Sequence, residues 1–179
     1  GYGALALADH ALDDQQIAIG HEALAAQSSV TNAGHNVAVG YDALTASTTG
    51  RKNCAFGHSA LKTVVAGAYN VAIGNNALED LPSDGTWNTA VGYLALANCN
   101  KTGDGNNVAL GGETGDLITS GNSNTCIGTN CDPGAADAVN QTCIGYGLGG
   151  VVDQDNSVVL GNSAVTKVYM SQDADAVMY

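Results

Sequence analysis

One pattern of apolar and polar positions recurs along the chain. The clear copies are NVAVGYDAL at 36–44, NCAFGHSAL at 53–61, NVAIGNNAL at 70–78 and NTAVGYLAL at 88–96. Looser copies stand at 16–24, 107–115, 124–132, 141–149 and 157–165. The motif glycines are 16 to 20 residues apart, and the length variation falls between motifs. A short period that tolerates insertions predicts a parallel β-solenoid of about nine rungs, stacked from one repeated unit. We assign residues 1–165 to this repeat and 166–179 to a junction leading toward a further domain.

Three apolar residues precede each motif glycine and predict one short strand per copy. The last of the three is large, as in Val39 and Phe56, and the first is mostly β-branched. The middle one is small in nearly every copy. Alternate residues of a strand point to opposite faces, so the large residues share one face and the small residues occupy the other. Both faces of the strands are therefore apolar.

Each of the two apolar faces needs its own surface against which it can be buried. One fills the interior of the coil, and the other needs a surface outside it. Small side chains allow the close approach of another chain, so we expect these strands to pack in a symmetric oligomer with an apolar seam along its axis. The seam residues would be Ala38, Ala55, Ala72, Ala90, Ala109, Cys126 and Cys143. The alternative is a wider monomeric solenoid whose two sheets cover both faces.

The rest of each copy has an expected structural role. The glycine should end the strand in a tight bend. The Ala-Leu pair that follows should return an apolar side chain to the core, as a second strand or as one helical turn. An amide stands before most strands, and stacked amides predict a hydrogen-bonded ladder. These amides are Gln16, Asn36, Asn53, Asn70, Asn88, Asn107, Asn124 and Gln141. The Ala-Leu pair is lost after 88–96, so the second edge of the coil is expected to change from about residue 107.

Composition narrows the function classes. The formal net charge is −12, with only five Lys and Arg. Phosphate neutralisation needs clustered cations, so nucleic-acid and anionic-membrane partners are not expected. No apolar run is long enough to span a membrane as a helix. The five cysteines lack the spacing of a zinc site, and we expect no metal and no cofactor. A disulfide between Cys126 and Cys143 is geometrically feasible, but the pattern does not require it.

No catalytic constellation is evident, and an enzyme is not expected. The histidines His10, His21, His35 and His58 lack a neighbouring nucleophile and orienting acid. The acidic pairs fall in connecting segments and are interpreted as solvated surface. The candidates for ligand binding are therefore the loop aromatics Trp87, Tyr93, Tyr41 and Tyr69, which could stack on sugar rings. For Trp87 the other interpretation is a ring packed over the neighbouring rung.

These residues carry a resemblance to known families. The N-x-A-V/I-G units resemble the head repeats of trimeric autotransporter adhesins, which are left-handed parallel β-rolls. The longer N-x-A-V/I-G-Y/H-x-A-L form is similar to repeats of phage tail fibres that precede an endosialidase-type intramolecular chaperone, and 156–179 is similar to the junction before it. The resemblance implies a homotrimer on a virion tail fibre or an extracellular cell surface, and a chain that is part of a longer protein.

Three functions remain open at this point. The chain is a structural or adhesive fibre segment that projects a cell-surface-binding region, or it is itself the receptor-binding head that reads a host or prey cell-surface glycan or protein. The third is an ice-binding solenoid, which the interruption of the Thr89, Thr125 and Thr142 column by Val and Cys disfavours.

Overall fold

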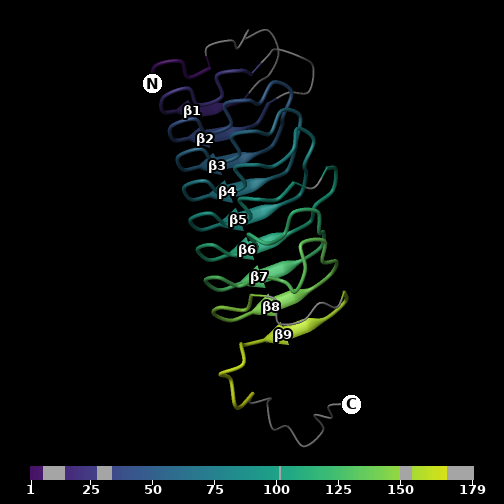
Figure 1. Ribbon diagram of the computed structural model, residues 1–179. Coiled ribbons are helices and arrows are strands. Elements are labelled where there is room, and N and C mark those ends of the chain that lie inside the picture. Colours follow the sequence, from purple (N-terminus) through teal and green to yellow (C-terminus); the bar gives the residue numbers. More distant parts are fainter. Residues whose placement is uncertain (6–14, 28–33, 101, 150–154, 169–179) are drawn as a thin grey trace, which may run out of the picture.

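The computed structural model describes residues 1–5, 15–27, 34–100, 102–149 and 155–168. These residues form an all-β coil in which nine three-residue strands stack along one axis (Figure 1). The strands are β1 (Ile17–Ile19), β2 (Val37–Val39), β3 (Cys54–Phe56), β4 (Val71–Ile73), β5 (Thr89–Val91), β6 (Val108–Leu110), β7 (Thr125–Ile127), β8 (Thr142–Ile144) and β9 (Val158–Leu160). Among the described residues no helix is long and apolar enough to cross a membrane.

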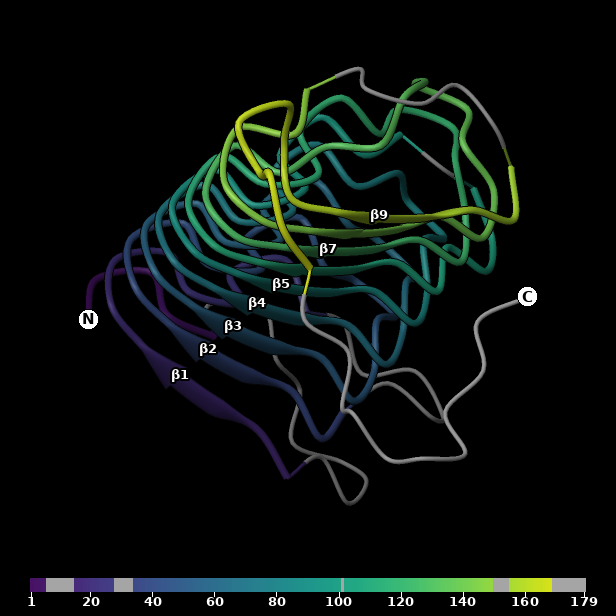
Figure 2. The same ribbon diagram turned by 90° about the horizontal axis from the view of Figure 1, so that it is seen from below.

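All strand pairs are parallel, and neighbours in the sheet are neighbours in the sequence. The chain thus advances by one strand per turn, which confirms the β-solenoid, here of about eight turns. Equivalent motif positions are in register, so Ala38 pairs with Ala55 and Ala55 pairs with Ala72. Viewed from the end, the rungs follow one another with a similar outline (Figure 2). Tight turns lie at one edge of the coil and longer connections at the opposite edge.

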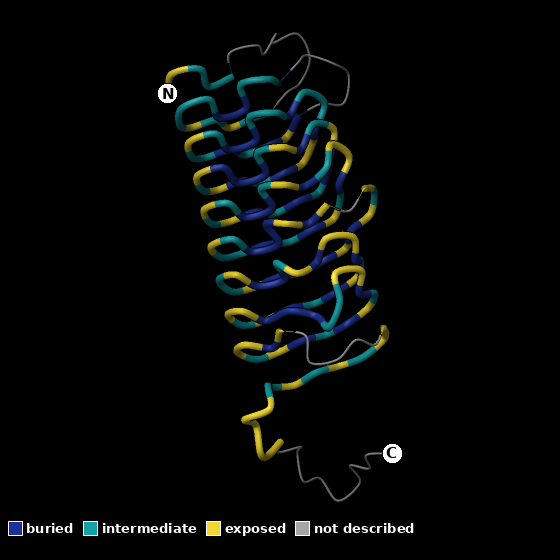
Figure 3. Tube along the Cα trace, in the orientation of Figure 1, coloured by how far each residue is buried: buried dark blue, intermediate teal, exposed yellow. Residues whose placement is uncertain are grey.

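The small middle residues of the strands point into the coil, and not toward a partner chain as expected. Six of the seven expected seam residues have no exposed surface, and Cys143 is 1% exposed. They belong to one core together with the leucines of the turns. Figure 3 shows a buried stretch that recurs in successive rungs. A Cβ added at Gly115 would lie 2.9 Å from Leu96 Cδ2 and 3.4 Å from Ala109 Cβ, so turn and strand side chains meet across a narrow interior. Only small residues fit opposite the leucines, which is why the expected orientation was wrong.

The Ala-Leu pair forms a tight turn, and neither of the two expected structures. Leu24, Leu44, Leu61, Leu78 and Leu96 adopt left-handed backbone angles, with φ between 50° and 53°. That conformation costs a non-glycine residue roughly 1–2 kcal/mol. Fully burying a leucine side chain contributes about 1.5–3 kcal/mol, and all five are fully buried. The turns also bond from rung to rung, as Leu44 N–H does to the Ala60 carbonyl at 3.0 Å.

The motif glycine has the role expected of it. Gly74 has φ +135°, and a Cβ added there would collide with the carbonyl group of Gly92 in the next rung. No other residue type fits this conformation and this close approach together.

The amide ladder is confirmed from Asn36 to Gln141. Asn70 Nδ2 donates to the Gly85 carbonyl at 2.8 Å and to Asn53 Oδ1 at 3.1 Å. Its own Oδ1 accepts from the backbone N–H of Asn88 at 3.0 Å. The amides from Asn53 to Asn124 each bond in this way to both neighbouring rungs and to a carbonyl of a connecting loop. The amide side chains from Asn36 to Gln141 are at most 1% exposed, so the bonds between successive amides lie away from water.

The second edge of the coil changes after Leu96, as expected, but the strands do not. The leucine of the turn is replaced by Gly115, Asp132 and Gly149 in successive copies. Ile118 and Leu148 are now buried in the core, while β6 to β9 keep the same parallel register.

Candidate functional site

The outer face of the strands is a stripe of exposed large apolar side chains. Every strand presents its first and third residues outward, and the third is at least as large as the first. Among the third residues, the most exposed are Ile19 at 60%, Phe56 at 53% and Leu160 at 47%. Ile73, Leu110, Ile127 and Ile144 complete the exposed set, and Val39 and Val91 are half-buried. We call these nine third-position residues the outer stripe. It runs along all nine strands on the side of the sheet opposite the core.

Rings stack in the column that follows the motif glycine. Tyr2, His21, Tyr41 and His58 lie one above another, with centroid separations of 5.6, 4.8 and 5.2 Å. Tyr93 belongs to the same column and is 55% exposed. The structure therefore places Tyr41 and Tyr93 on the tight-turn edge of the coil.

Tyr69 and Trp87 lie in a different column, before the amide ladder. Their rings stack at 4.1 Å with 6° between the planes, which confirms the packing of Trp87 over the neighbouring rung. Trp87 remains 51% exposed. Lys52 Nζ lies 5.1 Å from the centre of the Tyr69 ring and donates to its hydroxyl, which lowers the pKa of Tyr69. The four predicted aromatics therefore form no single site, because the strand separates the two columns.

The buried cysteines have the surroundings of packing residues. Cys126 of β7 and Cys143 of β8 lie opposite each other in the parallel strand register, and both are free thiols. Cys131 Sγ donates to the Cys143 carbonyl at 3.2 Å, and burial raises the pKa of Cys131 to about 11. A thiol with so high a pKa is protonated at neutral pH and is a poor nucleophile.

Asp132 is a buried acid beside these cysteines. It is 6% exposed and accepts a hydrogen bond from the backbone N–H of Leu117 at 3.3 Å. Burial, together with the charge of Asp116, raises its pKa to about 6. This position received no individual role from the sequence. Asp132 occupies the repeat position at which the earlier copies have a core leucine. This replacement is the feature of the sequence that could have identified it.

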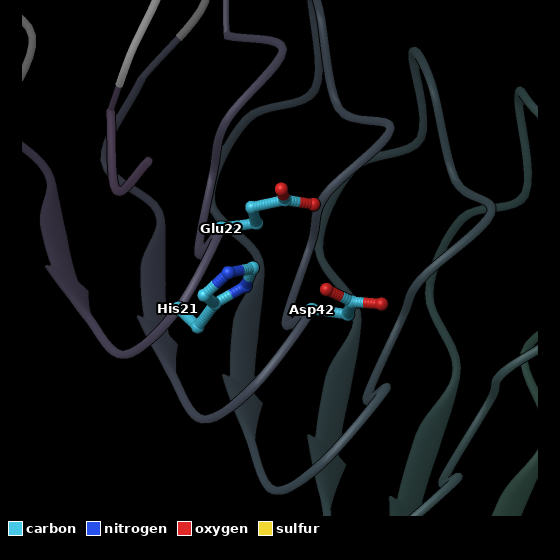
Figure 4. A group of neighbouring side chains, drawn as sticks. All are labelled: His21, Glu22 and Asp42. Atoms are coloured by element: carbon cyan, nitrogen blue, oxygen red, sulfur yellow. The ribbon is translucent and has the colours of Figure 1, made fainter. Parts of the chain in front are cut away.

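One group of side chains among the described residues has the geometry to hold a metal ion. His21, Glu22 and Asp42 each offer one ligand atom, and these atoms lie within 4.8 Å of one another (Figure 4). Sequence reasoning missed the group because it sought partners for each histidine only among that histidine's neighbours in the sequence. Aligning the columns would have placed Glu22 directly over Asp42 in the next rung.

Some sequence candidates lie outside the described residues. These are His10 and the acidic residues 13, 14, 153, 173 and 175. His35 is exposed at the rung edge and His58 is exposed in the ring stack.

Comparison with protein-family models, with curated proteins and with solved structures finds no match to this chain.

Proposed function

We propose that this chain is a structural segment of a trimeric surface or tail fibre, built as a left-handed β-roll, that projects a cell-surface-binding region. The observation that carries the proposal is the outer stripe. Its side chains are apolar, large and repeated at every strand, yet they are 36% to 60% exposed at seven of nine positions. A continuous apolar face of this kind marks an interaction surface.

The form of the stripe favours copies of the same chain as its partner. Strands stack about 4.8 Å apart, so nine strands give a stripe roughly 40 Å long. A stripe that runs the length of a rod is buried most simply against equivalent stripes around a common axis, which gives closed cyclic symmetry. The resemblance to trimeric adhesin heads and tail fibres supports three copies.

Sedimentation equilibrium at micromolar concentration tests the assembly. We expect a trimer for the native chain and monomers for a variant with Ile73→Asp and Ile144→Asp, because buried unpaired carboxylates oppose association. Tyr146→Asp is the matched control. Tyr146 is 72% exposed and follows the motif glycine, away from the outer stripe, so this variant should stay trimeric. Circular dichroism checks that all variants fold. A native chain that sediments as a monomer would overturn the proposal.

The second candidate is a receptor-binding head, and the Tyr69–Trp87 pair favours it. The two rings are stacked in parallel, Trp87 is half exposed, and the Lys52 ammonium lies against Tyr69, so the pair offers an apolar surface with a hydrogen-bond donor nearby. Flat sugar faces stack on such platforms. On a glycan array this function predicts binding that Trp87→Ala abolishes. Tyr93→Ala serves as control, since Tyr93 lies in the other ring column. An array with no bound glycan would favour the fibre segment.

A further inference from the structure

We propose that His21, Glu22 and Asp42 form a binding site for one divalent transition-metal cation of the zinc class. The site lies at the tight-turn edge, between the rungs of β1 and β2 (Figure 4). All three residues belong to one chain, so the proposal does not depend on the fibre function or on trimer assembly.

The backbone fixes the three residues in neighbouring rungs. Asp42 N–H donates to the His21 carbonyl at 3.0 Å, and Glu22 N–H donates to the Tyr2 carbonyl at 2.9 Å. Glu22 and Asp42 occupy the same position of the repeat, with φ of 53° and 55°. Their carboxylates are consequently one rung apart and share the side on which His21 lies. Side chains from two rungs thus converge through the in-register stacking.

Two polar atoms of the cluster are buried without a hydrogen-bond partner. His21 Nδ1 and Asp42 Oδ1 are among only five such side-chain atoms in the described part of the chain. A buried acceptor left without a partner carries a desolvation penalty. A cation between these groups would satisfy both atoms at once. This observation is independent of the proximity of the ligand atoms.

The ligands are also held in place before any ion binds. The His21 ring lies between the rings of Tyr2 and Tyr41, at 5.6 and 4.8 Å. Lys62 Nζ lies 3.5 Å from Asp42 Oδ2 and so holds one carboxylate oxygen, while Oδ1 stays unpartnered. Ligands that are already oriented lose little conformational entropy on binding.

The donor set selects the class of metal. One imidazole nitrogen and two carboxylate oxygens suit zinc and the neighbouring transition metals, whereas calcium and magnesium prefer oxygen ligands alone. The two carboxylates offset the charge of the cation. Three protein ligands leave at least one coordination position for water or for a group outside the chain.

The repeat supplies an internal control. His58 stacks on Tyr41 in the same ring column, but its neighbours at the carboxylate positions are Ser59 and Asn76. A site that needs the carboxylates cannot form there. His58→Ala removes an imidazole of the same column without touching the proposed ligands.

Isothermal titration calorimetry with Zn²⁺ on chelator-treated, full-length chain under reducing conditions tests the proposal. We expect one saturable site per chain and much weaker binding of Mg²⁺ and Ca²⁺. Asp42→Asn keeps the shape of the side chain and should weaken Zn²⁺ binding by at least about tenfold, since even outer-shell changes cost 10–100-fold. His21→Ala should do the same, and His58→Ala should leave the affinity unchanged.

Two results would overturn the assignment. One is the absence of saturable Zn²⁺ binding by the native chain. The other is undiminished binding by the double variant His21→Ala with Asp42→Asn, because the ion would then be held by cysteines or other surface groups. Visible absorption of the Co²⁺ complex provides a second readout, in which loss of the imidazole in His21→Ala should alter the d–d bands if the fold is retained.

Discussion

The rungs of β2 to β5 and those of β6 to β8 share one backbone frame but fill it differently. Both have three-residue strands in the same register and the same buried amide ladder. In the first group a leucine from each turn meets the small residues of the strands. In the second group Ile118, Cys131 and Leu148 fill the interior, and Asp132 stands where a leucine would be. The two groups of rungs therefore share the glycine bend and the amide ladder, while the apolar side chains that fill the interior differ.

The largest loss of stability should follow from substituting the motif glycine, a position that both groups of rungs share. This loss should be equal in the two groups. Gly74→Ala and Gly128→Ala each place a Cβ against the carbonyl group of the next rung, at φ of +135° and +125°. We expect each to lower the free energy of unfolding by at least about 3 kcal/mol, through overpacking and a disfavoured conformation. Urea denaturation measures this. Gly149→Ala is the control, since nothing lies within 4 Å of its added Cβ and the residue is exposed.

The next largest effect should separate the two regions. Leu78→Ala removes a fully buried side chain from the narrow interior and should cost about 2–5 kcal/mol. Cys131→Ala removes one buried sulfur atom from the turn that follows β7. It should lower the free energy of unfolding by only about 1 kcal/mol. Equal losses in thermal unfolding would show that both regions depend on the same core packing, which would contradict the comparison.

Asp132 should make the second region sensitive to pH. Its pKa is raised from 3.8 to about 6 in the folded chain, so the folded state holds this proton more tightly than the unfolded state. The contribution of Asp132 to stability is then greatest below pH 4 and falls as the pH rises through 6. Unfolding midpoints measured from pH 4 to pH 7 should decline for the native chain and decline less for Asp132→Asn. An unchanged slope in this variant would assign the dependence to other groups.

The smallest effect should follow from making the second region resemble the first. Cys126→Ala and Cys143→Ala install the residue that Ala72 and Ala90 provide in β4 and β5. We expect each to change the free energy of unfolding by less than about 1 kcal/mol, the value of one buried methylene-sized group. Differential scanning calorimetry resolves such a change. A loss of several kcal/mol in either variant would mean that the thiol pair has a structural role beyond filling space.

Much of the frame could be predicted because it depends on local chemistry repeated in register. The strands, the tight glycine bend and the amide ladder each follow from one residue type at one repeat position. The orientation of the strands did not follow, since alternation yields two faces without saying which is inside. The missing information was that the leucine of each turn points into the interior. Once Leu78 and its equivalents occupy the interior, only Ala72 and its equivalents fit opposite them.

The candidate sites were less accessible to sequence reasoning. Exposed aromatics could be named, but their division between two columns depends on where each loop leaves the strand. The group of His21, Glu22 and Asp42 spans two rungs, and its residues are unremarkable within either motif. An alignment of the motif copies indicates that Glu22 lies over Asp42, and the pairing of Ile17 with Val37 fixes this offset between the rungs.

The in-register amide ladder also gives the rungs a constant step along the axis of the coil. Every column repeats at a fixed step of about 4.8 Å, whatever the length of the loops between rungs. Adding or deleting one copy would change the length of the rod by that step and leave its cross-section intact. Each surface column is thus a row of equally spaced positions, and a substitution in one copy changes the side chain at a known height along the rod. Length and surface pattern can therefore vary independently in this architecture.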